Sequence, residues 1–160
     1  MKHISILAAM ALTAVLTGCA TAPVALAPVG PNPNGPQYSG NNGQLLVYSA
    51  LIGRVEGDNP TWHQHMNYTI YNQQDMRVMH VINKTGYYAR APRLVSLPPG
   101  NYLVKAEASD FTSVEVPVVI VSGRITRVHL DGTWHPTTTG QVGLVDLPTG
   151  DPVGWSTHTK

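Results

Sequence analysis

An alternation of apolar and polar residues with a period of two, between residues 100 and 131, most limits the folds that this chain can adopt. Such alternation predicts β-strands with one buried face. It occurs in three consecutive segments, 101–108, 114–121 and 125–131, the last two joined by the turn Ser122-Gly123. Pro117 lies inside the second segment and has no amide hydrogen for a ladder, so we expect an edge strand or a bulge there.

Shorter apolar segments predict strands in the rest of the chain, and no segment after residue 20 has the period of a helix. Segments 66–71 and 76–82 flank Asn72–Asp75, a turn-forming tetrad that predicts a hairpin. The other predicted strands are 45–52, 94–97, 142–147 and 153–155.

The seven or so short strands before residue 133, with their frequent turns, predict an all-β protein with a single antiparallel β-sandwich. We assign the sandwich to residues 44–132. Residues 133–160 are expected to form a loop and a C-terminal hairpin that packs on the domain or trails it.

The segment Leu97–Leu130 contains a Leu-Pro-Pro-Gly-x-Tyr turn, an aromatic-containing turn, a valine-rich strand and a glycine turn. It resembles the carboxypeptidase-regulatory, or prealbumin-like, β-sandwich modules. The residues that carry the resemblance are Leu97, Pro98, Pro99, Gly100, Tyr102, Val104, Ala106, Phe111, Val118 and Gly123. The resemblance implies a β-sandwich that serves as a spacer, an adhesion unit or a partner-binding module.

The N-terminus has the pattern of an export signal. A basic start is followed by an apolar run, Ile4–Leu16, which is too short to span a bilayer as a helix. The run ends in Leu16-Thr17-Gly18-Cys19, which resembles the lipobox of bacterial lipoproteins. This resemblance implies a signal peptide at 1–18 and a mature chain that begins at a lipidated Cys19.

Cys19 is the only cysteine, so it has no partner for an internal disulfide, and lipidation explains its presence in an exported chain better than a buried core cysteine does. Two or three acyl chains would hold it stably at a membrane. Ala20 resembles the residue that follows the cysteine in Gram-negative lipoproteins sent to the outer membrane. We therefore expect an envelope protein facing the periplasm or the cell surface.

Residues 20–43 are rich in proline, glycine and asparagine and contain no charged residue. Such a segment buries too little apolar surface to offset the entropy of ordering it. We therefore expect residues 19–43 to be a flexible tether between the lipid and the domain.

Charged residues make up 12% of the chain, and the side chains that remain after loss of Lys2 balance at nine basic and nine acidic. There is no basic stripe to attract phosphate. This balance excludes a nucleic-acid-binding protein.

His63 and His65 would point to the same side of an extended chain and could share a metal ion with His80, His129 or His135. No cysteine partner or His-Glu-x-x-His spacing accompanies them. They are weak metal candidates, and we expect neither a metal nor a cofactor.

Aromatic residues among Asn, Gln and Thr suit a glycan or protein contact. We select Trp62, Tyr87 and Tyr88 as candidate contact residues, and expect Trp134 and Trp155 to cover the ends of the sandwich. A face formed by Arg127, His129 and Asp131 is expected to be a solvated polar surface.

These features predict a non-enzymatic, lipid-anchored protein whose sandwich binds or braces another envelope component, without catalytic residues. A lipoprotein that binds carbohydrate or peptidoglycan is the alternative, and a small envelope hydrolase is a third possibility because catalytic triads assemble in space.

Overall fold

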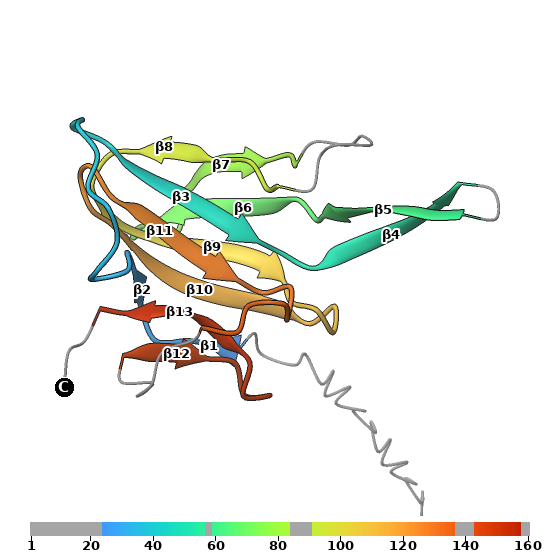
Figure 1. Cartoon of the computed structure of the whole chain (residues 1–160). Coiled ribbons are helices and arrows are strands. Elements are labelled where there is room, and N and C mark those ends of the chain that lie inside the picture. The colour runs from blue at the N-terminus through green and yellow to red at the C-terminus, as the bar shows by residue number, and fades with distance from the viewer. Residues whose placement is uncertain (1–23, 57–58, 84–90, 137–142, 158–160) are drawn as a thin grey trace, which may run out of the picture.

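The computed structural model describes residues 24–56, 59–83, 91–136 and 143–157. Within these residues the chain forms strands and no helix, arranged as a β-sandwich-like fold (Figure 1). The predicted all-β sandwich is confirmed. The described part of the chain has no helix long and apolar enough to cross a membrane.

The strands form one large sheet, one small sheet and a separate two-stranded ribbon. The large sheet has the order β12-β13-β2-β10-β9-β6-β7, with β1 also on β10; the small sheet is β11-β3-β8, and the ribbon is β4-β5. The ribbon projects from the sandwich (Figure 1). The bounds are β1 Val24–Ala25, β2 Val29–Gly30, β3 Gly43–Tyr48, β4 Leu51–Glu56, β5 Asn59–His65, β6 Tyr68–Asn72, β7 Arg77–Val81, β8 Val95–Leu97, β9 Gly100–Glu107, β10 Ser113–Ile120, β11 Ile125–His129, β12 Leu144–Asp146 and β13 Pro152–Ser156.

The strands expected from alternation are present as β9, β10 and β11, and the two expected hairpins are β6–β7 and β12–β13. The pairing is not purely antiparallel, because β1 and β2 run parallel to β10, and β11 runs parallel to β3. The turn at Ser122-Gly123 passes the chain from the large sheet to the small one. As a result β11 pairs with β3, in register Ile125↔Gln44 to His129↔Tyr48.

Pro117 does not lie on an edge strand. β10 pairs with β9 on one side and with the two short strands β1 and β2 on the other. β1 pairs at Val114 and Glu115 and β2 pairs at Val118, so Pro117 falls where this second neighbour is interrupted. Pro117, which has no amide hydrogen, therefore lies at a position of β10 that pairs with no residue of β1 or β2.

The expected flexible tether over 19–43 is wrong for its described part, because β1 and β2 belong to the large sheet. Val29 is completely buried. Beyond β2, the Arg124 guanidinium donates hydrogen bonds to the carbonyl oxygens of Asn32, Pro33 and Gly35, at 2.9, 2.9 and 3.3 Å. The dipeptides Val24-Ala25 and Val29-Gly30 are long enough to pair with β10, although prolines surround them. The composition of this segment does not reveal that pairing.

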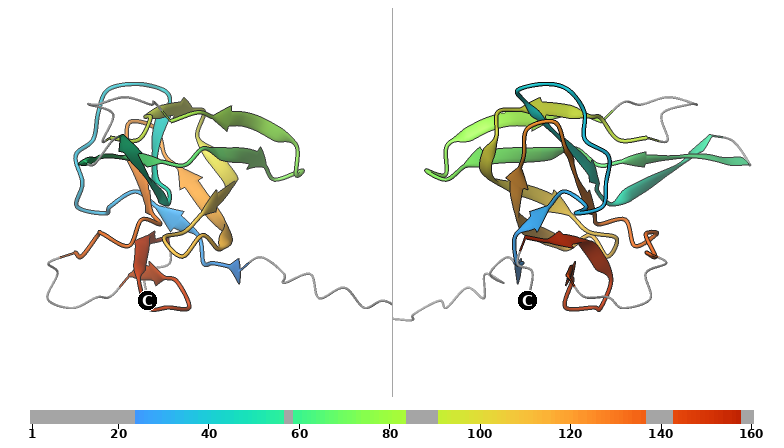
Figure 2. Two further views of the ribbon diagram at one scale, coloured as in Figure 1. Left: turned by 90° about the vertical axis from the view of Figure 1, so that its right-hand side faces the viewer. Right: turned by 60° about the vertical axis from the view of Figure 1, so that its left-hand side comes forward.

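The C-terminal hairpin also belongs to the sandwich, because β13 pairs with β2 and its Val153 is fully buried. Figure 2 shows these first and last strands of the domain beside one another. The core between the sheets consists of buried apolar side chains from both ends and the middle of the chain: Val29, Leu45, Val47, Tyr68, Ile70, Val81, Val95, Leu97, Val104, Ala106, Ala108, Val114, Val116, Val118, Ile120, Val128, Leu130, Val145, Leu147 and Val153.

Single residues determine the conformation of two turns. In the Leu-Pro-Pro-Gly-x-Tyr turn, the hydroxyl of Tyr102 donates a hydrogen bond to the carbonyl oxygen of Pro98 at 3.0 Å and ties the turn to β9. Gly123 has a φ of 66°, and an added Cβ would collide with the carbonyl oxygen of Tyr38. Only glycine suits this position, where residues 38–42 pack against the turn before β11.

Candidate functional site

The outer face of the small sheet carries aromatic and polar side chains side by side. On β3 and β11 alternate residues are buried in the core, so their neighbours point outward. The register places three outward pairs across these strands: Gln44–Ile125, Leu46–Arg127 and Tyr48–His129.

Four rings on this face contact one another in sequence, and we call them the aromatic row: Tyr48, His129, Trp134 and Trp155. Tyr48 and His129 stack with ring centroids 4.4 Å apart and planes inclined by 8°. Trp134 stacks on His129 at 4.4 Å and 15°, and Trp155 meets Trp134 edge-on at 6.4 Å and 67°. The row joins β3, β11, the loop after β11 and β13.

His129 is uncharged at neutral pH. Burial is the main reason that its pKa is lowered from 6.5 to about 4, with Arg127 and His65 adding to the effect and Asp131 opposing it. A neutral imidazole stacks between rings without the cost of desolvating a charge. The expected solvated polar face is therefore wrong for His129, because Trp134 from the following loop covers the ring.

Three hollows run along this face and share lining residues. A cavity of about 290 Å³ is lined by Asn32, Ile125, Arg127, His129, Trp134, Pro136 and Trp155. A narrow pocket shares Asn32, Ile125 and Arg127 with that cavity, and it shares Tyr38 with a larger polar cleft. We call these three consecutive hollows the groove.

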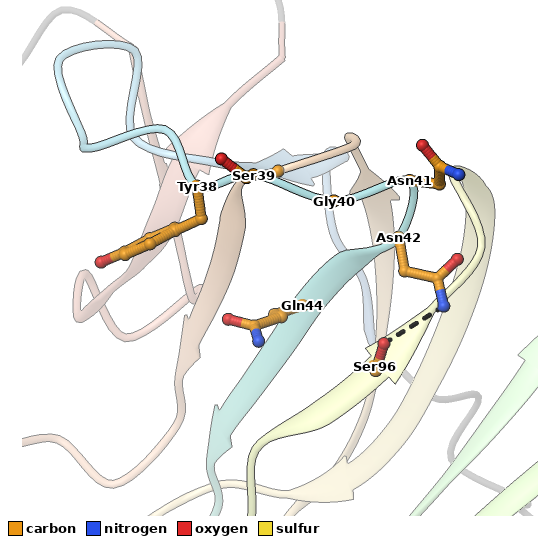
Figure 3. A pocket seen from close by; sticks show the side chains of 8 residues that line it. Tyr38, Ser39, Gly40, Asn41, Asn42, Gln44 and Ser96 are labelled. Atoms are coloured by element: carbon orange, nitrogen blue, oxygen red, sulfur yellow. Dashed lines mark hydrogen bonds between the residues drawn. The ribbon is translucent and has the colours of Figure 1, made fainter.

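The polar cleft has a volume of about 470 Å³ and is lined by Tyr38, Ser39, Gly40, Asn41, Asn42, Gln44, Ser96 and Gly123. In Figure 3 the Gln44 amide lies between the Tyr38 ring on one side and the Asn42–Ser96 pair on the other. The Asn42 amide donates a hydrogen bond to the Ser96 hydroxyl at 3.3 Å. The other amides and hydroxyls of the cleft offer donors and acceptors without formal charge.

The charges that line the groove are positive. Arg124 and Arg127 are lining residues, and none of the described lining residues is Asp or Glu. Arg124 is held by the carbonyl oxygens of residues 32–35. Arg127 lines the cavity, and its side chain has no hydrogen-bond or ion-pair partner among the residues that the structure describes.

Of the weak metal candidates, His65 has a structural role. Its ring is buried, and its Nδ1 lies 2.7 Å from the carbonyl oxygen of Ser49, which only accepts, so the ring proton is on Nδ1. The ring meets Tyr48 edge-on at 5.5 Å. The backbone of His63 lies in β5, and its side chain is outside the described part. Among the described residues, no three His, Cys, Asp or Glu side chains gather as metal ligands would.

None of the contact residues selected from the sequence is among the described lining residues of the groove. Trp62 belongs to β5 on the projecting ribbon, with its side chain outside the described part, and Tyr87 and Tyr88 lie outside the described residues, as does Cys19. They stay predictions. Trp134 and Trp155 were expected to cover the ends of the sandwich; together they line a cavity on the outer face of the small sheet. Their pairing depends on strand register, which the sequence did not supply.

Comparisons with known proteins do not assign this chain to a family. A scan against models of protein families finds no match, and searches of curated proteins and of solved structures find none either. The groove and the N-terminal pattern are therefore the basis for the function.

Proposed function

We propose that this protein is a lipid-anchored, non-catalytic binding module of the bacterial envelope, and that it holds another envelope component in the groove. One observation carries the proposal: three hollows with shared residues run along one face, beside four rings held in mutual contact. Preformed concave sites lined by aromatic rings and a few polar groups are typical of ligand binding.

The lipobox-like Leu16–Cys19 supports the anchor, which we place in the outer membrane, facing the periplasm or the cell surface. β1 begins at Val24, five positions after Cys19. Five residues reach about 17 Å at most. A lipid on Cys19 therefore keeps the sandwich close to the bilayer. The segment Leu97–Leu130 resembles prealbumin-like modules, which serve as spacers, adhesion units or partner-binding modules, and the last of these roles is the one proposed.

A carbohydrate or peptidoglycan strand is the occupant that the groove favours over a protein partner. Indole rings offer flat apolar surface with a polar edge, and the cleft next to them offers amide and hydroxyl groups. Sugars present the matching combination of C–H faces and hydroxyls.

Binding rather than hydrolysis is proposed because of what lines the groove. Its described lining contains one titratable base, His129, and no carboxylate. Glycoside hydrolysis commonly needs a pair of carboxylates across the scissile bond.

The anchor and the groove can be tested in the full-length protein in its host cells. Cys19→Ala should leave the leader uncut at this site and move the protein out of the detergent-extracted membrane fraction. Trp134→Ala should stay anchored and lose co-sedimentation with isolated cell-wall material, while the control Met76→Ala, on the opposite edge of the large sheet, keeps it. A normally processed, membrane-bound Cys19→Ala protein contradicts the anchor; wild-type protein that binds no envelope material contradicts the binding role.

A further inference from the structure

We infer that the groove is selective for an acidic glycan: a sugar ring lies against the two indoles of the cavity while a carboxylate of the strand pairs with Arg127. This inference rests on the proposed binding function and adds the chemical class of the ligand.

The aromatic end of the groove suits the apolar face of a sugar. Trp134 and Trp155 both line the cavity, and their planes are inclined by 67°, so they form two walls of different orientation. Trp134 is fixed from behind by His129, which is itself stacked on Tyr48. Rings held in this way bind without first losing rotational freedom.

The charge of the cavity points to an anion. Arg127 is the charged residue among those lining it, and within the described part of the chain its guanidinium has no hydrogen-bond or ion-pair partner. A guanidinium forks onto a carboxylate with two parallel hydrogen bonds. His129, beside it on the same strand, is neutral and adds no competing charge.

The polar end of the groove suits a ligand with neutral polar groups. The narrow pocket, of about 10 Å³, shares Asn32, Ile125 and Arg127 with the cavity and Tyr38 with the cleft, so the two larger hollows lie on either side of it. The cleft offers the side-chain amides of Asn41 and Gln44, which pair well with acetamido and hydroxyl groups. A strand of acidic sugars alternating with acetamido sugars meets both ends of the groove.

The test uses two probes, of which one has its negative charges removed: a hexasaccharide of alternating hexuronic acid and N-acetylhexosamine, and the same molecule with its carboxylates converted to methyl esters. Binding is measured by calorimetry and by quenching of tryptophan fluorescence on the full-length protein in detergent. We expect the acidic form to bind about tenfold more tightly than the ester, a difference of about 1.4 kcal/mol. Added salt should reduce this preference.

Variants separate the contribution of charge from that of fold. Arg127→Gln should bind both probes alike, Arg127→Lys should keep part of the preference, and Trp134→Ala should lose both ligands. Arg77→Gln is the matched control, because Arg77 is exposed on β7 of the other sheet. Melting temperatures of all variants check folding.

Equal affinity of the wild type for acid and ester, or an unchanged preference in Arg127→Gln, overturns the inference while leaving the binding function in place. So does wild-type protein that sediments with cell-wall material and binds neither probe. If the wild-type protein does not sediment with cell-wall material, the proposed binding function itself is contradicted.

Discussion

The indole of Trp134 lies on the imidazole of His129, with centroids 4.4 Å apart and planes inclined by 15°. His129 is brought beside Tyr48 by the parallel pairing of β11 with β3, and Trp134 follows in the next loop. The contact between the two rings therefore depends both on the pairing of β11 with β3 and on the loop that follows β11. Its strength should be sensitive to the charge of the imidazole.

Acid should weaken the fold through His129. Because burial lowers the pKa of this residue to about 4, the unfolded chain takes up the proton near pH 6.5 while the folded chain stays neutral. The neutral His129 therefore makes its full contribution to the free energy of unfolding above about pH 6.5. This contribution is lost as the pH falls from about 6.5 to about 4. Since the ring is partly exposed, we expect about 1–2 kcal/mol.

Urea unfolding at a series of pH values measures this effect. His129→Gln should show a shallower dependence on pH over the same interval than the wild type. His80→Gln, an exposed position on β7, should keep the wild-type dependence. Identical slopes for wild type and His129→Gln would contradict the prediction.

Val29→Ala should destabilise the domain by about 2 kcal/mol, because it empties space in a fully packed core. A tether residue would show no such loss. Val121→Ala is the control, since Val121 is 38% exposed and should change stability by less than about 0.5 kcal/mol. Denaturant midpoints compare the two variants, and equal midpoints would mean that β2 does not belong to the folded domain.

Gly154→Ala should disturb both stability and the groove. A Cβ at this position would lie 2.5 Å from Cγ1 of Val29 and 2.8 Å from the carbonyl oxygen of Arg127, so β13 would have to move away from β11. We expect a loss of about 1–3 kcal/mol and weaker ligand binding, because Trp155 is the next residue. In Gly53→Ala the added Cβ meets no atom of the described residues within 4 Å, so this variant should be neutral in thermal melting. A neutral Gly154→Ala would contradict the close packing of β13.

Tyr68→Phe should leave stability unchanged or raise it by up to about 1 kcal/mol. The Tyr68 hydroxyl is buried without a hydrogen-bond partner among the described atoms, and burial raises the pKa of this residue although Arg93 opposes the shift. Tyr102→Phe is the matched comparison, because it removes the bond to Pro98 and should cost about 1 kcal/mol. A clear loss of stability in Tyr68→Phe would show that this hydroxyl is satisfied.

The strands of the domain were predictable where alternation runs for many residues, as in β9, β10 and β11, or where a turn separates two apolar segments, as in β6–β7. β1 and β2 were missed because two residues each cannot display a period, and prolines around them favour an extended linker. The antiparallel expectation failed at β11 because a short turn predicts a hairpin, whereas this turn changes sheets.

The groove could not be predicted from sequence for a related reason. Tyr48 and His129 are distant in the chain, and only the register of β3 against β11 makes them neighbours. The sequence does show two tryptophans, Trp134 and Trp155, after His129. Their spacing, however, does not indicate that the three rings contact one another.

The pairing of Trp155 with Gly30 makes the start and the end of the described chain neighbours in one sheet. Asn32 and Trp155, which line the same cavity, come together only when β13 has reached β2. Contacts of such long sequence separation slow folding, since a large loop must close before they form. The cavity that these two residues line therefore forms only after β13 has been synthesised and has paired with β2.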